Sequence, residues 1–426
     1  MNLASAKFTY HSLLGVVFRD LVEKKGGLFA KKILFLGAST QQIPPINYAL
    51  KQGYYVITCD YFPNNPGHKL AHESHSVSTT DKEAVLVLAR RLKIDGIVAY
   101  ASDPAAPTQA YVAEEMGLVG NPYQSVLIMT RKDLFRKFLA SNGFFVPRSE
   151  VSVDLEEAVV FGTELGFPLI VKPVDSSGSK GVSKITESGQ MQGAFNSAMT
   201  FSQEKLVVVE HFLERDGYQV AGDGFVVDGN LVFRCWANEH FDKLCNSLVP
   251  IGESFPSVLS ESLQEKAHRE IQRLLRLLGV RVGALNFDFQ FNNQGVLFII
   301  EVGPRNGGNS IPEVIHHSTG IDLVKYTVDS ALGIDCSSLS MKQAKGFFSS
   351  YVVHSLEDGE VEEVWLSDEI HKNIVDNNVD VRNGDLVRRF DGSDNSLGTL
   401  ILTFETSGEM LYKMNNMEEH IRVTLK

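Results

Sequence analysis

Two carboxylates in one expected hairpin are the residues of this chain best suited to chemistry. In residues 285–291, read as Leu-Asn-Phe-Asp-Phe-Gln-Phe, apolar and polar side chains alternate with the period of a strand that has one apolar face. A turn of Asn-Asn-Gln-Gly follows, and the apolar second arm ends on Glu301. The sequence therefore predicts a β-hairpin with Asp288 in its first arm and Glu301 at the end of its second arm.

The register of this hairpin decides whether the two carboxylates meet. We expect Phe291 to pair with Val296 across the turn, which places Asp288 opposite Ile299. Residues two apart share a face, so Asp288 and Glu301 become diagonal neighbours about 5 to 8 Å apart. Two carboxylates at that distance do not both stay ionised without a cation, and Mg2+, or Mn2+ in its place, fits the pair. The alternative is two solvated surface acids.

A glycine-rich segment with one arginine follows Glu301 directly. Gly303, Gly307 and Gly308 let the backbone approach a ligand closely, because glycine has no Cβ atom. Arg305 adds a planar, permanently charged group that suits a carboxylate or a phosphate. The alternative is a glycine-rich turn with a surface arginine, but the neighbouring metal carboxylate favours a ligand site.

A second candidate ligand segment follows the expected strand Leu169–Pro173. This strand places Lys172 at its end and continues into a small, hydroxyl-rich loop. Consecutive backbone N–H groups in such a loop can cradle a phosphate, with Lys172 as a point charge. The motif G-x-x-x-x-G-K-[ST] is absent here, and an ordinary hairpin turn is the alternative. The loop residues expected at the phosphates are Ser176, Ser177, Gly178, Ser179 and Gly181.

Two further segments are expected to flank this loop. Residues 132–143 have the pattern of an amphipathic helix that begins at Lys132 and ends at Gly143. The apolar strand Leu206–Val209 leads into a linker over residues 210–213. Free backbone N–H and C=O groups of such a linker could pair with an adenine edge, and a plain strand-to-loop exit is the alternative.

The first part of the chain predicts a parallel sheet. Strands that alternate with helical patterns form a parallel sheet covered on both faces. Such sheets bind ligands at the carboxyl ends of their strands, where Gly37, Asp60 and Asp103 fall. A dinucleotide site is a weak alternative, because G-x-G-x-x-G is absent after the first strand. The expected strands are Ile33–Leu36, Tyr55–Thr58 and Ile97–Ala99.

Composition sets the outer limits. The 426 residues, 43% hydrophobic and 22% charged, are typical of a globular chain with two to four domains or subdomains. The net charge of −12 argues against broad nucleic-acid binding, and no apolar run approaches the about 18 residues of a membrane span. Residues 1–30 lack a convincing signal peptide and are expected to be an extension or packing helix. The four widely spaced cysteines favour free thiols in a reducing cytoplasm.

Taken in order, these segments resemble the ATP-grasp superfamily of carboxylate–amine ligases. The matching features are Lys132, Lys172 with its serine-rich loop, the linker 210–213, Asp288, and the segment from Glu301 to Arg305. The resemblance runs from Lys31 to Ala331. It extends loosely to Gly346–Lys426, as in members like glycinamide ribonucleotide synthetase, L-amino-acid ligase and the large subunit of carbamoyl-phosphate synthase.

This resemblance implies an α/β and α+β fold with three parts. A parallel-sheet preATP domain precedes an ATP-grasp fold of two subdomains, and a small β-rich piece ends the chain. The expected boundaries are 1–30 for the N-terminal extension, 31–122 for the preATP-grasp domain, 123–335 for the ATP-grasp domain with a lid subdomain at about 148–212, and 336–426 for the C-terminal β-rich subdomain.

The resemblance also implies roles at the nucleotide. Lys132 and Lys172 would hold the ATP phosphates, and the serine-rich loop would close over them as a lid. Glu210 and Leu213 would take the adenine edge through their backbone groups. Phe212, in the same linker, is counted with them as a residue of the nucleotide site.

At the reacting groups the resemblance implies a metal pair and two catalytic cations. The metal ligands would be Asp288 and Glu301, and the catalytic residues would be Lys172 and Arg305. Two positions depart from the family pattern. Gly303 stands where many members have Asn, so at least one metal would be held more by phosphate and water. Gln219 stands where members often place a Glu against the ribose, although a neutral amide can still bond a ribose hydroxyl.

The implied function is an ADP-forming, ATP-dependent ligase that makes an amide through an acyl phosphate. A small amino-acid-like carboxylate and an amine would be its substrates, with neither nucleic acid nor membrane as a partner, in the cytoplasm. A homodimer stays an open alternative. Two other functions stay open as well: a non-catalytic nucleotide sensor, and an ATP-dependent phosphotransferase whose product is a phosphorylated substrate.

Overall fold

The N-terminal part of the described chain is a four-stranded parallel sheet, as the sequence predicted. The computed structural model describes residues 30–242 and 244–426, so the expected extension lies outside the described residues except for Ala30. The strand order is β3-β2-β1-β4, and all neighbours run parallel. The strands are β1 (Lys32–Leu36), β2 (Tyr55–Cys59), β3 (Glu73–His75) and β4 (Gly96–Ala99).

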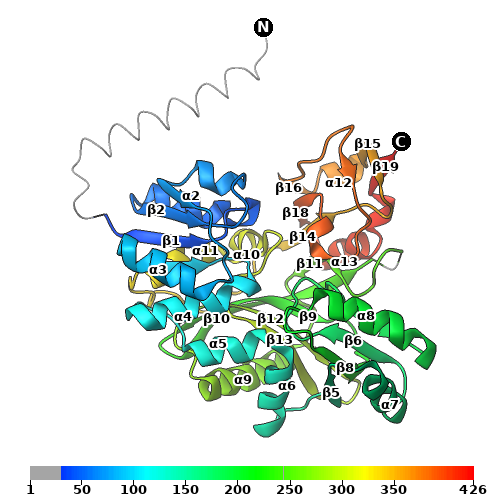
Figure 1. Cartoon of the computed structure of the whole chain (residues 1–426). Coiled ribbons are helices and arrows are strands. Elements are labelled where there is room, and N and C mark those ends of the chain that lie inside the picture. Colours follow the sequence, from blue (N-terminus) through cyan, green and yellow to red (C-terminus); the bar gives the residue numbers. More distant parts are fainter. Residues whose placement is uncertain (1–29, 243) are drawn as a thin grey trace.

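Helices cover both faces of this sheet (Figure 1), which confirms the predicted layering. On one face Ile33 and Phe35 pack against α2 and α11, and on the other Leu34 and Leu36 pack against α3 and α4. The helix α11 comes from far along the chain, so the first sheet is completed only by a late segment. The helices are α2 (Ile43–Lys51), α3 (Lys82–Leu92), α4 (Ala106–Met116) and α11 (Leu323–Ala331), with short 3-10 helices η1 (Thr40–Gln42), η2 (Pro66–Lys69) and η3 (Asp103–Ala105).

A large antiparallel sheet forms the middle of the molecule. Its eight strands follow the order β13-β12-β9-β10-β11-β14-β18-β16. Three of them come from the C-terminal part of the chain, so the expected β-rich piece shares a sheet with the centre of the molecule. The strands are β9 (Val220–Val227), β10 (Asn230–Phe241), β11 (Pro250–Phe255), β12 (Gly283–Phe291), β13 (Leu297–Gly303), β14 (Phe347–Val353), β16 (Ile374–Asn377) and β18 (Gly398–Phe404).

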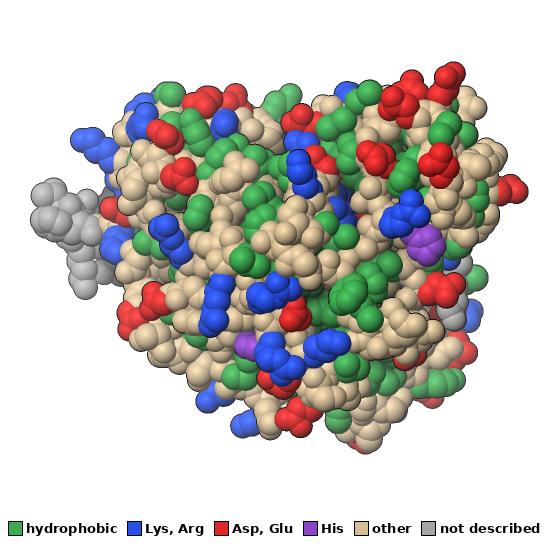
Figure 2. Space-filling view, turned by 90° about the horizontal axis from the view of Figure 1, so that it is seen from below, with side chains coloured by type: hydrophobic (Ala, Val, Ile, Leu, Met, Phe, Trp, Pro, Cys, Tyr) green, Lys and Arg blue, Asp and Glu red, His purple; other side chains and the backbone are tan. Residues whose placement is uncertain are grey.

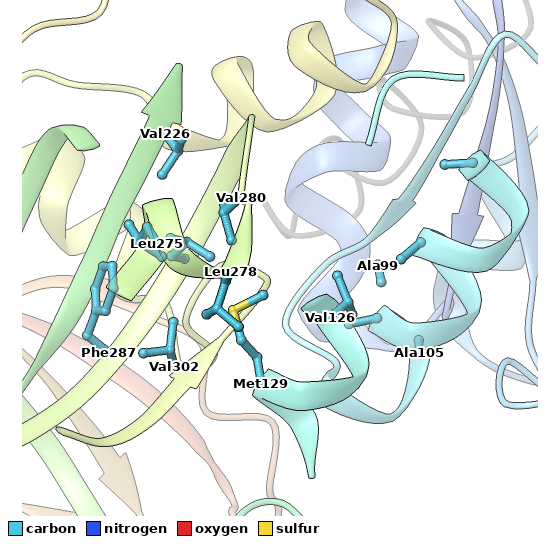
Figure 3. Close-up of a cluster of buried hydrophobic side chains, with 14 of the residues drawn as sticks. Ala99, Ala105, Val126, Met129, Val226, Leu275, Leu278, Val280, Phe287 and Val302 are labelled. Carbon is cyan, nitrogen blue, oxygen red and sulfur yellow. The ribbon is translucent and has the colours of Figure 1, made fainter. Parts of the chain in front are cut away.

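One face of the large sheet is apolar and packs on helices. Figure 3 shows Phe287 of β12 and Val302 of β13 with Leu275 and Leu278 of one helix and Met129 of another. Burying a side chain the size of Phe287 contributes about 1.5–3 kcal/mol. On the opposite face β12 carries Asn286, Asp288 and Gln290, as the alternation in residues 285–291 predicted, whereas β9 and β10 carry Phe225 and Phe233 on that face. The covering helices are α5 (Tyr123–Thr130), α6 (Lys132–Ser141) and α9 (Glu261–Leu278).

The predicted register of the β12–β13 hairpin is wrong by one residue. Phe291 pairs with Leu297, not with Val296, because Val296 belongs to the turn, where its N–H donates to the side chain of Asn292 at 2.9 Å. A β-bulge then shifts the register between Asp288 and Phe289. Asp288 therefore lies directly opposite Glu301, not opposite Ile299.

A smaller antiparallel sheet of order β5-β8-β6-β7 follows α6 in the chain. The strand predicted over Leu169–Pro173 is confirmed, and it forms a hairpin with β7 around the serine-rich loop. The strand predicted to end at Val209 is longer than expected, because it continues to His211. The elements are β5 (Ser149–Ser152), α7 (Leu155–Leu165), β6 (Leu169–Pro173), β7 (Ser183–Ile185), η4 (Ser188–Gln190), α8 (Met191–Phe201) and β8 (Val207–His211).

The remaining elements surround the C-terminal end of the large sheet. Three short strands form a separate sheet of order β17-β15-β19. One helix, α10 (Ile311–Thr319), begins directly after the glycine-rich segment and lies near β14. The others are β15 (Gly359–Leu366), α12 (Asp368–His371), β17 (Leu386–Val387), η5 (Ser393–Asn395), α13 (Ser407–Asn415), η6 (Met417–Glu419) and β19 (Ile421–Leu425).

The surface carries charges of both signs. Figure 2 shows the molecule from below, with Lys and Arg side chains gathered near the middle of that face among apolar and acidic ones. The helix α9 lies low in Figure 1, and its residues His268, Arg269, Arg273 and Arg276 line one surface pocket. Within the described residues, no helix is both long enough and apolar enough to cross a membrane. All four cysteines are free.

Candidate functional site

The two expected metal carboxylates meet on the polar face of the large sheet. Asp288 and Glu301 are directly paired across β12 and β13. Burial, together with the negative charge of Glu301, raises the pKa of Asp288 to about 7. A divalent cation would remove this repulsion. No third Asp, Glu, His or Cys completes a metal cluster among the described residues, so Mg2+ would need further oxygens from phosphate and water.

Lys132 connects this pair with the serine-rich loop. It is the first residue of α6, and its backbone N–H donates to the carbonyl of Val174 at 2.9 Å. Its Nζ donates to the carbonyl of Ser176 at 2.6 Å and lies 3.8 Å from Oε2 of Glu301. The expected phosphate lysine, the loop and one expected metal ligand therefore lie at one place.

Lys172 and Glu210 form a buried ion pair. Arg136 also pairs with Glu210, and the sequence did not predict this contact. Nε of Arg136 donates to Oε2 of Glu210 at 3.1 Å, and Nζ of Lys172 donates to Oε1. Although burial alone would raise the pKa of Glu210, the two cations lower it to about 2. Burial outweighs the attraction of Glu210 and lowers the pKa of Lys172 to about 8, so Lys172 is still mostly a cation at neutral pH.

Arg136 also fixes the hairpin that carries the metal pair. Its Nη1 donates to the carbonyl of Ile300 at 2.8 Å. Ile300 is the residue that the bulge leaves without a partner, directly before Glu301. One buried arginine thus ties α6, β8 and β13 together. The sequence signal for this buried contact was a charged residue, Arg136, on the face of an amphipathic helix that is buried.

The serine-rich loop contacts the C-terminal part of the chain. The Ser179 hydroxyl donates to the carbonyl of Leu248 at 2.8 Å, and the Ser393 N–H donates to the carbonyl of Gly178 at 3.2 Å. Gly178 and Gly181 have φ values of 65° and 73°, a conformation that glycine adopts without strain. The carbonyl of Ser176 accepts from Lys132. Ser177, the remaining loop residue expected at the phosphates, makes no side-chain hydrogen bond within the described chain.

The expected adenine linker begins later than predicted. Glu210 lies inside β8 and pairs with Ser149 of β5 and Ile170 of β6, so its backbone belongs to the sheet. The Phe212 N–H donates to the carbonyl of Pro168 at 3.1 Å. The Leu213 carbonyl accepts from Gln290 at 3.2 Å. Adenine binding at this strand exit stays a prediction, and it cannot use the backbone of Glu210 unless the sheet opens there.

Two buried glutamates close to the metal pair were not predicted. Glu239 and Glu253 face each other across β10 and β11, and each has a carboxyl oxygen without a hydrogen-bond partner. Burial raises the pKa of both carboxyls well above the ordinary value, and the charge of Asp288 adds to it. Gln219, the expected ribose residue, lies against the carboxyl of Glu239. The sequence signal for Glu239 was a Glu between Asn238 and His240 at the end of a mostly apolar strand.

Arg305 pairs with Asp103 of the N-terminal part of the chain. Nε and Nη2 of Arg305 donate to the two carboxylate oxygens of Asp103 at 2.7 and 2.6 Å. A Cβ atom at Gly303 would lie 2.9 Å from Oδ1 of Asp103 and 3.2 Å from Cζ of Arg305. The departure from Asn at position 303 therefore has a physical reason: the ion pair fills the space.

Asp223 holds the glycine-rich segment. This aspartate lies inside β9, between Gly222 and Gly224. Both carboxylate oxygens of Asp223 accept from the Gly307 N–H, at 2.9 and 2.8 Å, and one accepts from Asn286 at 2.9 Å. Burial raises the pKa of Asp223 to about 6, although the hydrogen bonds from these donors act to lower it. The loop after Glu301 is thus anchored to the sheet.

Comparison with known proteins finds one family model and many relatives. Residues 131–339 match the model described as carbamoyl-phosphate synthase L chain, ATP binding domain. The carbamoyl phosphate synthase large chain of Thermoanaerobacter pseudethanolicus is 26% identical over 239 residues, which are 55% of this chain and 21% of that protein. The chain thus spans about a fifth of the length of this carbamoyl phosphate synthase large chain.

Two solved structures share the fold over nearly the whole chain. The L-amino acid ligase from Bacillus licheniformis aligns with a TM-score of 0.76 at 19% identity, covering 93% of this chain and 99% of that one. The phosphoribosylglycinamide synthetase from Anaerococcus prevotii aligns with a TM-score of 0.71 at 22% identity, covering 93% and 100%. The mixed α/β fold is therefore confirmed.

Proposed function

We propose that the protein is an ATP-dependent, ADP-forming carboxylate–amine ligase of the ATP-grasp superfamily, a proposal that the match of residues 131–339 to the ATP-binding domain of carbamoyl-phosphate synthase supports. The observation that carries the proposal is the direct pairing of Asp288 with Glu301, with Nζ of Lys132 3.8 Å from Glu301. The pair would give a site for Mg2+, and the lysine connects it with the loop expected to hold phosphates. The proposed domain boundaries are those expected from the sequence.

The proposed reaction has two steps. A carboxylate oxygen of the acid attacks the γ-phosphorus of ATP, the bond to the β–γ bridging oxygen breaks, and ADP leaves. The amine nitrogen then attacks the acyl carbon, phosphate leaves, and the nitrogen loses a proton to give the amide. Mg2+, when bound, supplies positive charge at the phosphates.

The residues of the chain would mainly position the substrates and neutralise the negative charge of the phosphates. Lys132 and Lys172 would hold phosphate oxygens, although Lys172 would have to share its proton donors with Glu210. Arg305 has donors left besides those used on Asp103 and on the carbonyl of Asn306, and these would face the acyl phosphate. The loop over residues 176–181 would exclude water from the intermediate.

A small amino-acid-like acid is the proposed carboxylate substrate. The compact Gly-Gly-Asn-Ser segment at 307–310 and the arginine beside the metal pair support this choice. We would measure ADP release with Mg2+, ATP and each of the common amino acids, alone and in pairs. Amino-acid-dependent ADP release is the expected result, and product mass must show two joined substrates.

Other outcomes would point to the alternatives. A product that carries only a phosphoryl group would indicate a phosphotransferase. ATP binding without turnover, unaffected by Asp288→Asn, would indicate a nucleotide sensor. No stimulation of ADP release by any acid–amine pair would contradict the ligase proposal.

A further inference from the structure

The serine-rich loop over residues 176–181 is held at its base and at its tip. At the base, the side chain of Asp175 accepts from the backbone N–H groups of Gln203 and Glu204 at 3.2 and 2.8 Å, so the base is fixed to the connection between α8 and β8. At the tip, the loop contacts the C-terminal part of the chain, whose strands β14 and β18 lie above the small sheet in Figure 1. The tip therefore joins segments that are far apart in the sequence.

The closest contact of the tip is with Ser393, the first residue of η5. The Ser393 N–H donates to the carbonyl of Gly178 at 3.2 Å. A Cβ atom at Gly178 would overlap with the hydroxyl of Ser393, so the loop reaches this position because it carries a glycine there. The stem of Lys180 packs at the same place, since a Cβ atom at Gly392 would lie 3.0 Å from its Cγ.

A second contact joins the tip to the loop between β10 and β11. The Ser179 hydroxyl donates to the carbonyl of Leu248 at 2.8 Å. Ser179 has a φ of 59°, which is costly for a residue other than glycine. Strain of this kind persists where the surrounding contacts hold the backbone. The docked conformation of the loop therefore depends on the two contacts of its tip.

The two segments that receive the tip are also bound to each other. Nδ2 of Asn246 donates to the carbonyl of Asp391 at 3.3 Å. In the other direction, Nη2 of Arg389 donates to the carbonyl of Cys245 at 3.2 Å. The tip thus docks on one connected surface rather than on two independent loops. We call this surface the loop seat, and it consists of residues 245–248 and 389–395.

The docked loop also reaches the expected metal pair. The carbonyl of Ser176, at the start of the loop, accepts from Nζ of Lys132, which lies 3.8 Å from Oε2 of Glu301. The loop therefore extends from the metal pair to the loop seat. A nucleotide with its phosphates at Lys132 would be covered only while the tip keeps this position, because glycines allow the loop other conformations.

We propose that the loop seat holds the serine-rich loop over the nucleotide through the Ser393 N–H and the Leu248 carbonyl, and that Ser393 is a positioning residue of the reaction. The inference rests on the proposed function, in which this loop excludes water from the acyl phosphate. Residues 389–395 lie outside the segment 131–339 that matches the ATP-binding domain. The C-terminal part of the chain thus completes the nucleotide site from outside that domain.

Ser393→Pro removes the donor with little disturbance of the fold. Ser393 begins a 3-10 helix, where proline is favoured, and Gly392 before it is extended, with a φ of −165° and a ψ of 162°. The matched control is Ser188→Pro. Ser188 is the exposed first residue of η4, Glu187 before it is extended, and the Ser188 N–H makes no hydrogen bond within the described chain.

Trypsin cleavage of the whole protein measures the position of the loop without turnover. Lys180 is the only lysine or arginine in residues 176–181, so cleavage after it gives fragments that mass spectrometry identifies. The cleavage rate of a loop that opens and closes rapidly reports the fraction of open loop. Loss of one hydrogen bond should raise this rate about fivefold in Ser393→Pro and in the second variant, Ser179→Ala, with no change in Ser188→Pro.

Nucleotide and turnover give two further readouts. Mg2+ with the non-hydrolysable analogue adenylyl imidodiphosphate should slow cleavage after Lys180 in the wild type and should slow it less in Ser393→Pro. In the same variant, the ratio of ADP released to amide formed should rise about fivefold, because water reaches the acyl phosphate. A purely structural role of Ser393 would instead lower the melting temperature and leave this ratio unchanged.

Equal cleavage after Lys180 in the wild type, Ser393→Pro and Ser188→Pro would overturn the proposal, as would equal protection by the analogue. Protection that depends on Ser393, without amide formation from any acid–amine pair, would support the loop seat and contradict the ligase function. The two proposals therefore fail on different results.

Discussion

At the residue scale, the candidate site is organised by pairs of charged side chains that lie far apart in the sequence. Asp288 meets Glu301, Lys172 meets Glu210, and Arg305 meets Asp103. The first pair joins like charges and the other two join opposite charges. A bound cation would therefore stabilise the first pair, whereas each of the other two pairs already contains both a positive and a negative charge.

The like-charged pair gives the first prediction. Asp288→Asn should reduce ADP release by about a hundredfold or more, because it removes a metal ligand. The same change should raise the thermal stability of the metal-free protein, since it removes the repulsion that raises the pKa of Asp288. Thermal unfolding with and without Mg2+ and ADP checks both parts. A variant that is less stable without metal, yet still stabilised by Mg2+, would contradict the prediction.

The buried pair of Lys172 and Glu210 gives the second prediction. Glu210→Gln should lower the free energy of unfolding by about 3–5 kcal/mol, because two buried cations lose their counter-charge. Urea unfolding measures the loss. Glu164→Gln, at an exposed position on α7, is the matched control and should change the free energy by less than about 0.5 kcal/mol.

The pH dependence of this variant follows from the same carboxylate. The pKa of Glu210 is about 2 in the folded protein, below the ordinary value of 4.5. Its contribution to stability is therefore fully present above pH 4.5 and is lost as the pH falls from 4.5 towards 2. In Glu210→Gln the free energy of unfolding should fall less steeply over this range. An unchanged slope would contradict the role given to the pair.

At the element scale, the glycine-rich segment after β13 is shaped by its neighbours. Gly303 leaves room for the ion pair between Arg305 and Asp103, and the Gly307 N–H is bound by Asp223. The segment ends where α10 begins, and Gly307 and Ser310 line a cavity of about 1320 Å3 together with residues of η1 and β16. One short loop thus touches the metal pair, the N-terminal part of the chain and the cavity.

The third prediction concerns this loop. Gly303→Asn, which introduces the residue common in the family, should lower the melting temperature, because its Cβ atom would lie 2.9 Å from Asp103. In the Asp103→Gly variant, which lacks that carboxylate, Gly303→Asn should lower the melting temperature less. A double-mutant cycle by thermal unfolding measures the coupling, with about 0.5–3 kcal/mol expected. Additive effects of the two changes would contradict the steric explanation for Gly303.

At the scale of the whole molecule, segments far apart in sequence complete one another's sheets. The helix α11 covers one face of the N-terminal sheet, and β14, β16 and β18 extend the large sheet. A Cβ atom at Gly96 of β4 would lie 2.6 Å from the Ala331 carbonyl, which shows how closely α11 approaches. The proposed domain boundaries therefore do not mark pieces with separate cores.

The fourth prediction follows from this packing. A fragment of residues 30–122 should not unfold cooperatively, because it keeps α2 but loses α11, which covers the rest of the sheet face that carries Ile33, Phe35, Val56 and Val98. A fragment of residues 30–335 retains α11 and should keep this face covered. Circular dichroism during urea unfolding compares the two. A cooperative transition in the shorter fragment would show that the N-terminal sheet has an independent core.

Local periodicity and residue type were sufficient to predict most of the strands, the two faces of the first hairpin arm and the parallel sheet of the N-terminal part. It placed Lys132 at the start of a helix and Lys172 at the end of a strand, and both positions are as predicted. Alternation placed Asp288 on the polar face of its strand, but Glu301 shares that face only because the bulge at Ile300 shifts the register.

The contacts of these side chains depend on how distant segments pack and could not be predicted from the sequence. The carbonyl of Ile300, at the bulge that brings Asp288 opposite Glu301, accepts from Arg136, which lies 164 residues earlier in the chain, and a local pattern does not show such a contact. The same holds for the bond of Arg305 to Asp103, 202 residues away. Periodicity fixes which way a side chain faces, whereas its partners are chosen by packing between distant segments.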